Sequence, residues 1–377
     1  MFHGAAILGW RLRLPCYVAP LLSPLYSQSD AKVSIARFRI PMSSNQTENL
    51  LFETSPFGTI DAIVEHDGRV VFFYLNERPE NSAQPQPAHP QGKFGMRACW
   101  VRNLQRGPIV LNKADMTQGM APMMPRNDCI DSDLHSLPNS SSLSIVWFEE
   151  GNGAALLEID DETKHQSTIA IIPPWSGIDG FFGYASNCAH ESPLAWPMPK
   201  NKSLQLRIDQ AAEFWNSFTA DSSPFVNLQH ELISAYDVGF GADNQKQYYA
   251  IDGGKFPPRG LIRYETESET IVLTVGMSLC PMPSVELSVE NPSDLRRIEI
   301  GAKVTHGESG INEALVESSI RSISSYAAYP WLNHSWLGPE HTIDWSTTQS
   351  KATLVKNDSV RVPTFRNDPI NLLWINT

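Results

Sequence analysis

The chain has 377 residues, about the length of two domains, and 41% of them are hydrophobic against only 19% charged, a composition that excludes intrinsic disorder as its main state. Its 29 basic and 41 acidic residues give a net charge of −12, which repels phosphate backbones and anionic headgroups and argues against a nucleic-acid or membrane-surface partner. The five cysteines are at least 30 residues apart with no CxxC pair. This pattern is typical of a reducing compartment and predicts neither a zinc ribbon nor a disulfide framework.

The N-terminal segment differs from the rest of the chain. Residues 1–40 contain five basic residues and one acidic residue, and their longest apolar run, residues 4–10, is too short for a signal-peptide core or a membrane span. We expect residues 1–41 to be a poorly structured extension preceding a functional start near Met42, with a degenerate targeting peptide as the alternative. No later run approaches the roughly 20 apolar residues of a spanning helix, so a cytoplasmic protein is predicted.

The first half of the chain shows strand patterns joined by tight turns. Asp67-Gly68 and Gly151-Asn152-Gly153 are typical of hairpin turns, because glycine tolerates positive φ. Residues 77–93, with four prolines, are predicted to form a loop. The expected strands are 59–65, 69–76, 98–104, 143–149, 154–159 and 167–172.

Two helices are predicted near the middle of the chain. Apolar residues recur at steps of four and three from Leu204 to Phe218, which places them on one helix face. A second helix is expected over residues 225–236. The polar break at residues 220–224 predicts the domain boundary, so the expected domains are residues 42–221 and 222–377.

The second half returns to strand patterns. Strands are expected at 247–251, 260–265, 270–279, 285–289 and 297–304, a helix at 311–328, and last strands at 352–355 and 370–375. The predicted fold class is α+β: two mostly β domains with mixed or antiparallel sheets, each packed by one or two helices.

Few residues suggest catalysis. Ser278 lies in Gly276-Met277-Ser278-Leu279-Cys280, close to a nucleophile elbow, but Pro281 and Pro283 follow where that motif needs a helix. Cys188 lies two residues before His190, yet a thiolate usually meets its histidine across the fold. The acidic loop 127–135 lacks the glycine and glutamate of a calcium loop and is interpreted as solvated. No metal and no cofactor are predicted.

Two segments are dense in aromatic residues, glycine and proline: residues 248–260 and 329–343. Such segments usually form rigid packed loops. The alternative is a partner-binding patch, since Trp, Tyr and Arg contribute most to interface energetics.

Three motifs within these regions resemble the suppressor-of-fused domain family in its bacterial-type form, over roughly residues 225–375. They are the strand end Thr274-Val275-Gly276-Met277-Ser278, the helix end Ala327-Ala328-Tyr329-Pro330, and Trp336-Leu337-Gly338-Pro339-Glu340-His341-Thr342-Ile343. The last departs from the family pattern at Glu340, where glycine with its freer backbone is usual.

The resemblance implies an α+β domain without known catalysis. The family's animal member is a cytoplasmic regulator that sequesters a transcription factor, whose peptide adds as a β-strand between two domains. Bacterial relatives are thought to be immunity proteins that neutralise toxins. Both roles imply a protein or peptide partner, and the acidic body of this chain would suit a basic one.

The predicted function is therefore a non-enzymatic protein-binding module that holds its partner near the cleft between domains. Trp331, Trp336, Leu337 and His341 are predicted to form the wall of the cleft, and Asp252 and Arg259 its polar contacts. The alternative is a hydrolase that uses Ser278 or Cys188 with a histidine base, such as His341 or His190.

Overall fold

The computed structural model describes residues 47–78, 95–160, 162–177, 180–218, 223–345 and 350–376. The extension predicted for residues 1–41 and most of the loop predicted for residues 77–93 lie outside them. Residues Met42–Thr377 form one compact unit, and everything below concerns that unit. Within the described residues, no helix is both long and apolar enough to cross a membrane.

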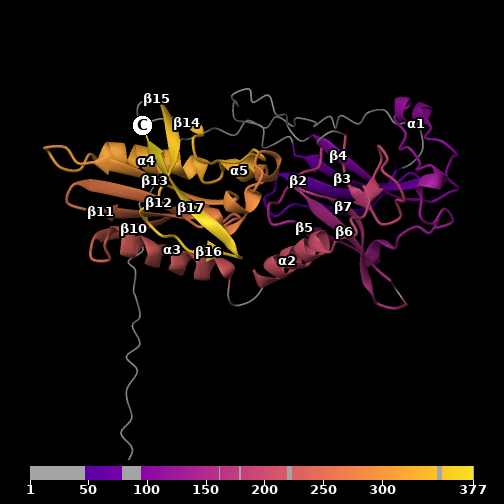
Figure 1. Ribbon diagram of the computed structural model, residues 1–377, viewed down its shortest axis with the longest axis horizontal. Coiled ribbons are helices and arrows are strands. Elements are labelled where there is room, and N and C mark those ends of the chain that lie inside the picture. Colours follow the sequence, from indigo (N-terminus) through magenta and orange to yellow (C-terminus); the bar gives the residue numbers. More distant parts are fainter. Residues whose placement is uncertain are drawn as a thin grey trace, which may run out of the picture. The chain divides into compact units, whose positions relative to one another are not determined.

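Two sheets make up the first half (Figure 1). An antiparallel sheet in the order β1-β2-β3-β4 contains β1 (Glu48–Thr54), β2 (Ile60–His66), β3 (Val70–Glu77) and β4 (Met96–Asn103). A second, in the order β5-β6-β7-β8-β9, contains β5 (Leu143–Trp147), β6 (Ala154–Ile159), β7 (Gln166–Ile172), β8 (Tyr184–Ala185) and β9 (Trp196–Pro197). Between β4 and β5 lie α1 (Lys113–Thr117) and short 3-10 turns at Arg126–Asp128 and Ser140–Ser142.

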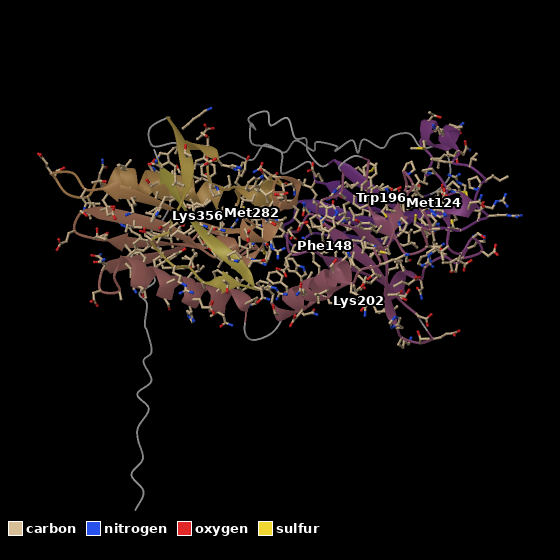
Figure 2. All side chains as sticks on the ribbon, viewed as in Figure 1. Met124, Phe148, Trp196, Lys202, Met282 and Lys356 are labelled. Atoms are coloured by element: carbon tan, nitrogen blue, oxygen red, sulfur yellow. The ribbon has the colours of Figure 1, made fainter. Side chains whose placement is uncertain are left out.

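The two sheets share one core. Phe73 and Trp100 from the first sheet and Leu156 from the second are fully buried in a single apolar cluster. Met124, from the connection between the sheets, is also buried there (Figure 2). Burial of this apolar surface stabilises the contact between the sheets.

Both predicted helices near the middle of the chain are present. Helix α2 (Ser203–Ser217) buries Leu204, Ile208 and Ala211, as the spacing predicts, and also Phe214. Helix α3 (Pro224–Phe240) is capped at its N-terminus by Ser223, whose hydroxyl oxygen accepts the Phe225 N–H. A serine cap followed by proline at the first helical position is a favourable start for a helix.

The second half is built on one eight-stranded mixed sheet in the order β10-β11-β12-β13-β17-β15-β14, with β16 paired to β17. Among the described strands of this sheet, β13 and β17 are parallel neighbours and the other pairs are antiparallel. The strands are β10 (Gln245–Ala250), β11 (Gly260–Glu265), β12 (Glu269–Val275), β13 (Arg297–Thr305), β14 (Thr342–Trp345), β15 (Ser350–Lys356), β16 (Thr364–Phe365) and β17 (Asp368–Asn376).

Helices cover both faces of this sheet (Figure 1). On β11, Arg263 bonds Glu313 at the start of α4 (Glu313–Tyr326), while its neighbour Tyr264 bonds Asp237 in α3. Successive strand residues point to opposite faces, so α3 and α4 lie on opposite sides. The short helix α5 (Tyr329–Leu332) follows α4. The predicted α+β class is confirmed.

One predicted strand is wrong, and another is shorter than predicted. Residues 285–289, expected as a strand, form a 3-10 turn at Val285–Leu287, because the N–H groups of Leu287 and Ser288 bond locally to the carbonyls of Ser284 and Val285. The strand expected over 270–279 ends at Val275. Gly276, with φ of 97°, turns the chain there into a 3-10 turn at Met277–Leu279. A last such turn spans Pro292–Asp294.

Candidate functional site

An aromatic cluster joins the two halves of the compact unit. Phe57, in the turn between β1 and β2, lies with its ring centroid 5.2 Å from that of Phe256 and 6.0 Å from that of Trp331, stacked at 2°. Trp215 of α2 makes an edge contact with Phe57 at 6.5 Å. The two aromatic-rich segments singled out in the sequence therefore meet on one side chain from the first half.

A cleft of about 260 Å³ is lined by residues from both halves. The β5–β6 turn contributes Glu149 and Glu150, and α2 contributes Arg207 and Glu213. From the second half come Arg296 and Arg297 of the β13 region and Arg366, Asn367 and Asp368 of the β16–β17 turn. The lining therefore combines four arginines with four acidic residues.

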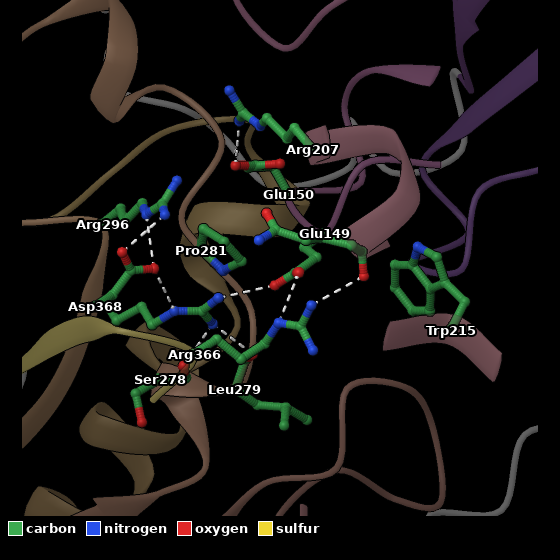
Figure 3. A network of polar contacts seen from close by, with 12 residues as sticks. Glu149, Glu150, Arg207, Trp215, Ser278, Leu279, Pro281, Arg296, Arg366 and Asp368 are labelled. Atoms are coloured by element: carbon green, nitrogen blue, oxygen red, sulfur yellow. Dashed lines mark hydrogen bonds and ion pairs between the residues drawn. The ribbon is translucent and has the colours of Figure 1, made fainter. Parts of the chain in front are cut away.

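Arg297 is the centre of the polar network in this cleft, although its side chain is only 1% exposed. Figure 3 labels its partners Glu149 and Asp368. Its Nε donates to Asp368 at 2.9 Å, Nη2 donates to Glu149 at 2.8 Å, and Nη1 donates to the carbonyl oxygens of Ser278 and Leu279. A guanidinium has five donors in a planar fork. Arg297 uses that fork to tie the β5–β6 turn to the second half.

Two more arginines extend the network. Arg296 holds Asp368 with two bonds of 2.7 Å, and Arg366 lies 3.0 Å from Glu149 and donates to the Gln210 carbonyl oxygen. Asp368 thus accepts from both Arg296 and Arg297. Bidentate arginine–carboxylate pairs fix geometry as well as charge.

Arg207 forms the other end of the network. It lies 2.6 Å from Glu150 and 2.8 Å from Glu286, and so links α2 with the Val285–Leu287 turn. Burial disfavours its charged form, but the two carboxylates outweigh this effect and raise its pKa. Burial also raises the pKa of Glu286, against the opposing effect of Arg207. The second oxygen of Glu150, Oε2, is buried without a hydrogen-bond partner among the described residues.

The backbone that presents Arg366 is strained. Arg366 and Asn367 have φ of 50° and 67° in the two-residue turn between β16 and β17, a conformation that costs an L-residue roughly 1–2 kcal/mol. Such conformations persist only where the surroundings hold them, and they cluster at functional sites. Here the strain places the Arg366 guanidinium 5.6 Å above the Phe214 ring and beside Glu149.

The predicted polar residues Asp252 and Arg259 lie in the turn between β10 and β11. The Asp252 carboxylate accepts the N–H groups of Gly254 and Arg259 at 2.6 and 3.0 Å, so it shapes the turn. Arg259 Nη1 donates to the Ala327 carbonyl oxygen at 3.3 Å, and its Nε has no partner among the described residues. Burial lowers the pKa of Arg259, with Asp252 opposing this.

Of the predicted aromatic and apolar wall, two members are buried. Trp331 is 2% exposed and its Nε1 donates to the Pro281 carbonyl oxygen, and Leu337 is 4% exposed. Trp336 and His341 are half-buried, with ring centroids 4.3 Å apart. None of the six predicted residues lines the charged cleft, and their contact with a partner stays a prediction.

Glu340 adopts the left-handed conformation, with φ of 70°. This is the position at which the family pattern has glycine, the residue that accepts positive φ most readily. Glu340 thus adopts a conformation that glycine accepts at lower cost. His341 donates its N–H to the Gly338 carbonyl oxygen and closes the turn.

Ser278 has a structural partner. Its side chain is fully buried, and its hydroxyl donates to Glu299 at 2.6 Å. The N–H groups of Gly276 and Ser278 and the hydroxyl of Thr274 donate to the same carboxylate. Burial raises the pKa of Glu299, and these four bonds oppose the rise. The Gly-Met-Ser motif thus forms a cradle for a buried acid.

Cys188 is fully buried, and its thiol donates to the carbonyl oxygens of His190 and Ala195. Burial raises its pKa to about 11, which opposes nucleophilic reactivity at neutral pH. Within the described ranges, neither Ser278 nor Cys188 bonds a histidine ring. Across the part of the chain that the structure describes, no group of three His, Cys, Asp or Glu side chains is placed to hold a metal ion.

The sequence predicts a cleft between the domains but names none of the residues that line this one: Arg296, Arg297, Glu149, Glu150 and Arg366 have no role in that prediction. One signal was available: Arg297 and Glu299 alternate with Ile298 and Ile300 in the first part of β13, which is buried. Charged residues at such positions are rarely buried without partners.

One family model matches the chain. It is described as Suppressor of fused protein (SUFU), and it covers residues 259–375, less than half of the sequence. The resemblance is confirmed over these residues, whereas residues 225–258, which were predicted to share it, lie outside the match. No curated protein and no solved structure matches the chain. The matched region contributes Arg296, Arg297, Arg366 and Asp368, one side of the cleft.

Proposed function

We propose that this protein is a binding module of the suppressor-of-fused type, which holds a segment of a protein partner at the charged cleft between its two halves. The matched family is a non-catalytic protein-interaction family. The observation that carries the proposal is the cleft itself, whose lining joins arginines of the matched region to acidic residues outside it.

The physical character of the cleft suits a polar segment. The buried arginines and carboxylates already neutralise one another, so they form a rigid floor of fixed dipoles. Glu213 and Asn367 line the cleft and are exposed, which leaves them free to contact a partner. Charged groups arranged in this way contribute mainly to specificity and to the rate of association.

The residues predicted from the sequence lie outside the lining of the charged cleft, and we propose them as additional partner contacts. We retain Trp336, His341, Asp252 and Arg259 as candidate contacts, because none of them is fully buried. Trp331 is buried, so we propose that it has a structural role: it stabilises the junction between the halves by stacking on Phe57.

The cellular role is a finer proposal. Sequestering or neutralising the partner, with toxin immunity as one form, rests on the resemblance alone. The net charge of −12 favours a basic partner by long-range attraction. The immunity role is tested by co-expressing this protein with a toxin encoded nearby. Growth should be restored to that of cells without the toxin, and continued growth inhibition would contradict the role.

The proposed site is tested by affinity capture from the native cell with quantified partner recovery. Glu213→Lys reverses a charge in the cleft and is expected to reduce recovery about tenfold. Glu317→Lys is the matched control on α4, where the Glu317 side chain is 67% exposed, and it should bind like the wild type. Equal recovery with both variants, with thermal unfolding unchanged, would place the binding site elsewhere.

A further inference from the structure

Two cysteines from distant parts of the first half face each other directly. Cys129 follows the Arg126–Asp128 turn, and Cys188 follows β8, 59 residues later in the sequence. They are the partners of an isolated antiparallel bridge. The Ile130 N–H bonds the Asn187 carbonyl oxygen, and the Ala189 N–H bonds the Asp128 carbonyl oxygen, each at 2.8 Å.

These two bonds flank the cysteine pair and do not involve it. Cys129 and Cys188 therefore form a non-hydrogen-bonded antiparallel pair, in which the Cα atoms are about 4.5 Å apart and the side chains lie on the same face. Disulfides require Cα separations of roughly 4.4–6.8 Å. The backbone thus already holds the two residues at a separation that a disulfide accepts.

The two thiols are close enough to influence each other. Burial raises the pKa of Cys129 to about 11, and the neighbouring Cys188 adds to the rise. The Cys129 thiol contacts the Pro125 carbonyl oxygen at 3.5 Å and accepts from Asn103 Nδ2 at 4.0 Å, both weak contacts, and its residue is partly exposed. Cys188 is fully buried. The pair therefore combines one partly exposed cysteine with one buried cysteine.

We propose that Cys129 and Cys188 form a thiol–disulfide site that reacts with low-molecular-weight disulfides such as oxidised glutathione. The Cys129 thiolate attacks the oxidised glutathione, forms a mixed disulfide and releases one glutathione thiol. The Cys188 thiolate then attacks the Cys129 sulfur, forms the internal disulfide and releases the second glutathione thiol. The two protein thiols lose two protons and two electrons, and the glutathione disulfide gains them.

Cys99 lies near this pair but has a different position. It belongs to β4, is fully buried, and its thiol contacts the carbonyl oxygens of Trp100 and Tyr184. It shares no backbone bridge with Cys188. Metal binding by these cysteines is a weaker interpretation, since the described residues hold no group of three candidate ligands.

The bond would close a long loop. The segment between the two cysteines contains β5, β6 and β7, together with the turn that carries Glu149 and Glu150. Linking its ends reduces the freedom of the unfolded chain. We expect the oxidised protein to melt roughly 5–10 °C above the reduced protein.

The test uses the full chain with Cys16→Ser, incubated in glutathione buffers of increasing oxidised fraction. We expect the intact mass to fall by two hydrogen atoms and peptide mapping to join Cys129 to Cys188. The rate should rise about tenfold per pH unit below pH 11, because the thiolate is the attacking species.

Variants identify the pair. Cys129→Ser should abolish the internal bond, whereas Cys280→Ser, at a fully buried cysteine of the second half, should leave it unchanged. Cys188→Ser should also abolish the internal bond. If that variant fails to fold, peptide mapping of the Cys16→Ser protein still shows which two cysteines are joined. A product that holds only glutathione adducts, a bond that joins Cys99 to Cys188, or no reaction after full equilibration would overturn the proposal.

Discussion

At the scale of single residues, the junction depends on charges that are buried and paired. Arg297 makes four hydrogen bonds and has almost no exposed surface. Arg297→Ala would remove one of the two arginine partners of Asp368 and of Glu149, and it would take the donor from two buried carbonyl oxygens, so we expect a loss of about 3–5 kcal/mol in unfolding free energy. Urea denaturation measures it. Arg321→Ala, at a side chain that is 70% exposed, should cost less than about 0.5 kcal/mol; similar losses for both would refute the argument.

His334 should make the unfolding free energy fall as the pH falls. Burial, aided by the positive charge of Arg97, lowers its pKa from 6.5 to about 4, so the native state keeps the ring neutral; Glu77, 3.7 Å away, is the nearby acid. As the pH falls from about 6.5 to 4, His334 becomes protonated in the unfolded chain but stays neutral in the native state. Stability therefore falls by about 3 kcal/mol over that window and the effect levels off below it.

His334→Asn tests this assignment, because asparagine tolerates the φ of 47° found at this position. Urea denaturation at several pH values should show a shallower loss of stability between pH 6.5 and 4 than in the wild type. His190→Asn, at an exposed histidine, is the control and should keep the wild-type slope. An unchanged slope in His334→Asn would mean that other groups cause the acid sensitivity.

Ser278 is expected to be structural. Ser278→Ala removes one of four donors from the buried Glu299 carboxylate, and we expect a loss of about 2 kcal/mol, since bonds to buried charges are the strong ones. Ser324→Ala removes a hydroxyl that only bonds the preceding turn of its own helix and should be nearly neutral. Thermal unfolding with partner capture checks both. Partner recovery by Ser278→Ala below that expected from its folded fraction would contradict a purely structural role.

At the scale of elements, long periodic patterns were predictable and short ones were not. The spacing from Leu204 onward matches α2, and the strand predicted at 154–159 coincides with β6. The strand β1 was missed, since it is an exposed edge without a clear alternation, and so was the two-residue strand β16. Short elements depend on tertiary partners, which a local pattern does not contain.

The turn between β16 and β17 carries a prediction of its own. Asn367 has φ of 67°, so Asn367→Gly should keep or raise stability by up to about 1 kcal/mol, while Asn367→Val should lower it by roughly 1–2 kcal/mol. Urea denaturation of the pair of variants compares the same position with and without a branched Cβ. Equal stability of the glycine and valine variants would show that the turn is not strained.

At the scale of the whole molecule, the site was beyond local prediction because it is assembled from segments far apart in the chain. Arg297 and Glu149 are separated by 148 positions, and no spacing rule links them. The family motifs lie in the half that supplies Arg296, Arg297, Arg366 and Asp368 to the cleft, and the two aromatic-rich segments meet at the junction. The charges between the halves follow only from the three-dimensional packing.

This packing predicts that the two halves unfold together. Phe57 belongs to the first half, but its ring packs on Trp331 and Phe256 of the second. Phe57→Ala should therefore lower the unfolding free energy by about 2–3 kcal/mol and reduce hydrogen-exchange protection in β13 and β17 as well as in β2. Phe52→Ala, at a ring of β1 that is 57% exposed, is the control and should change protection only locally. If Phe57→Ala weakens the first half alone, the halves are independent domains, and the junction is a contact between stable bodies that a partner could separate at little cost.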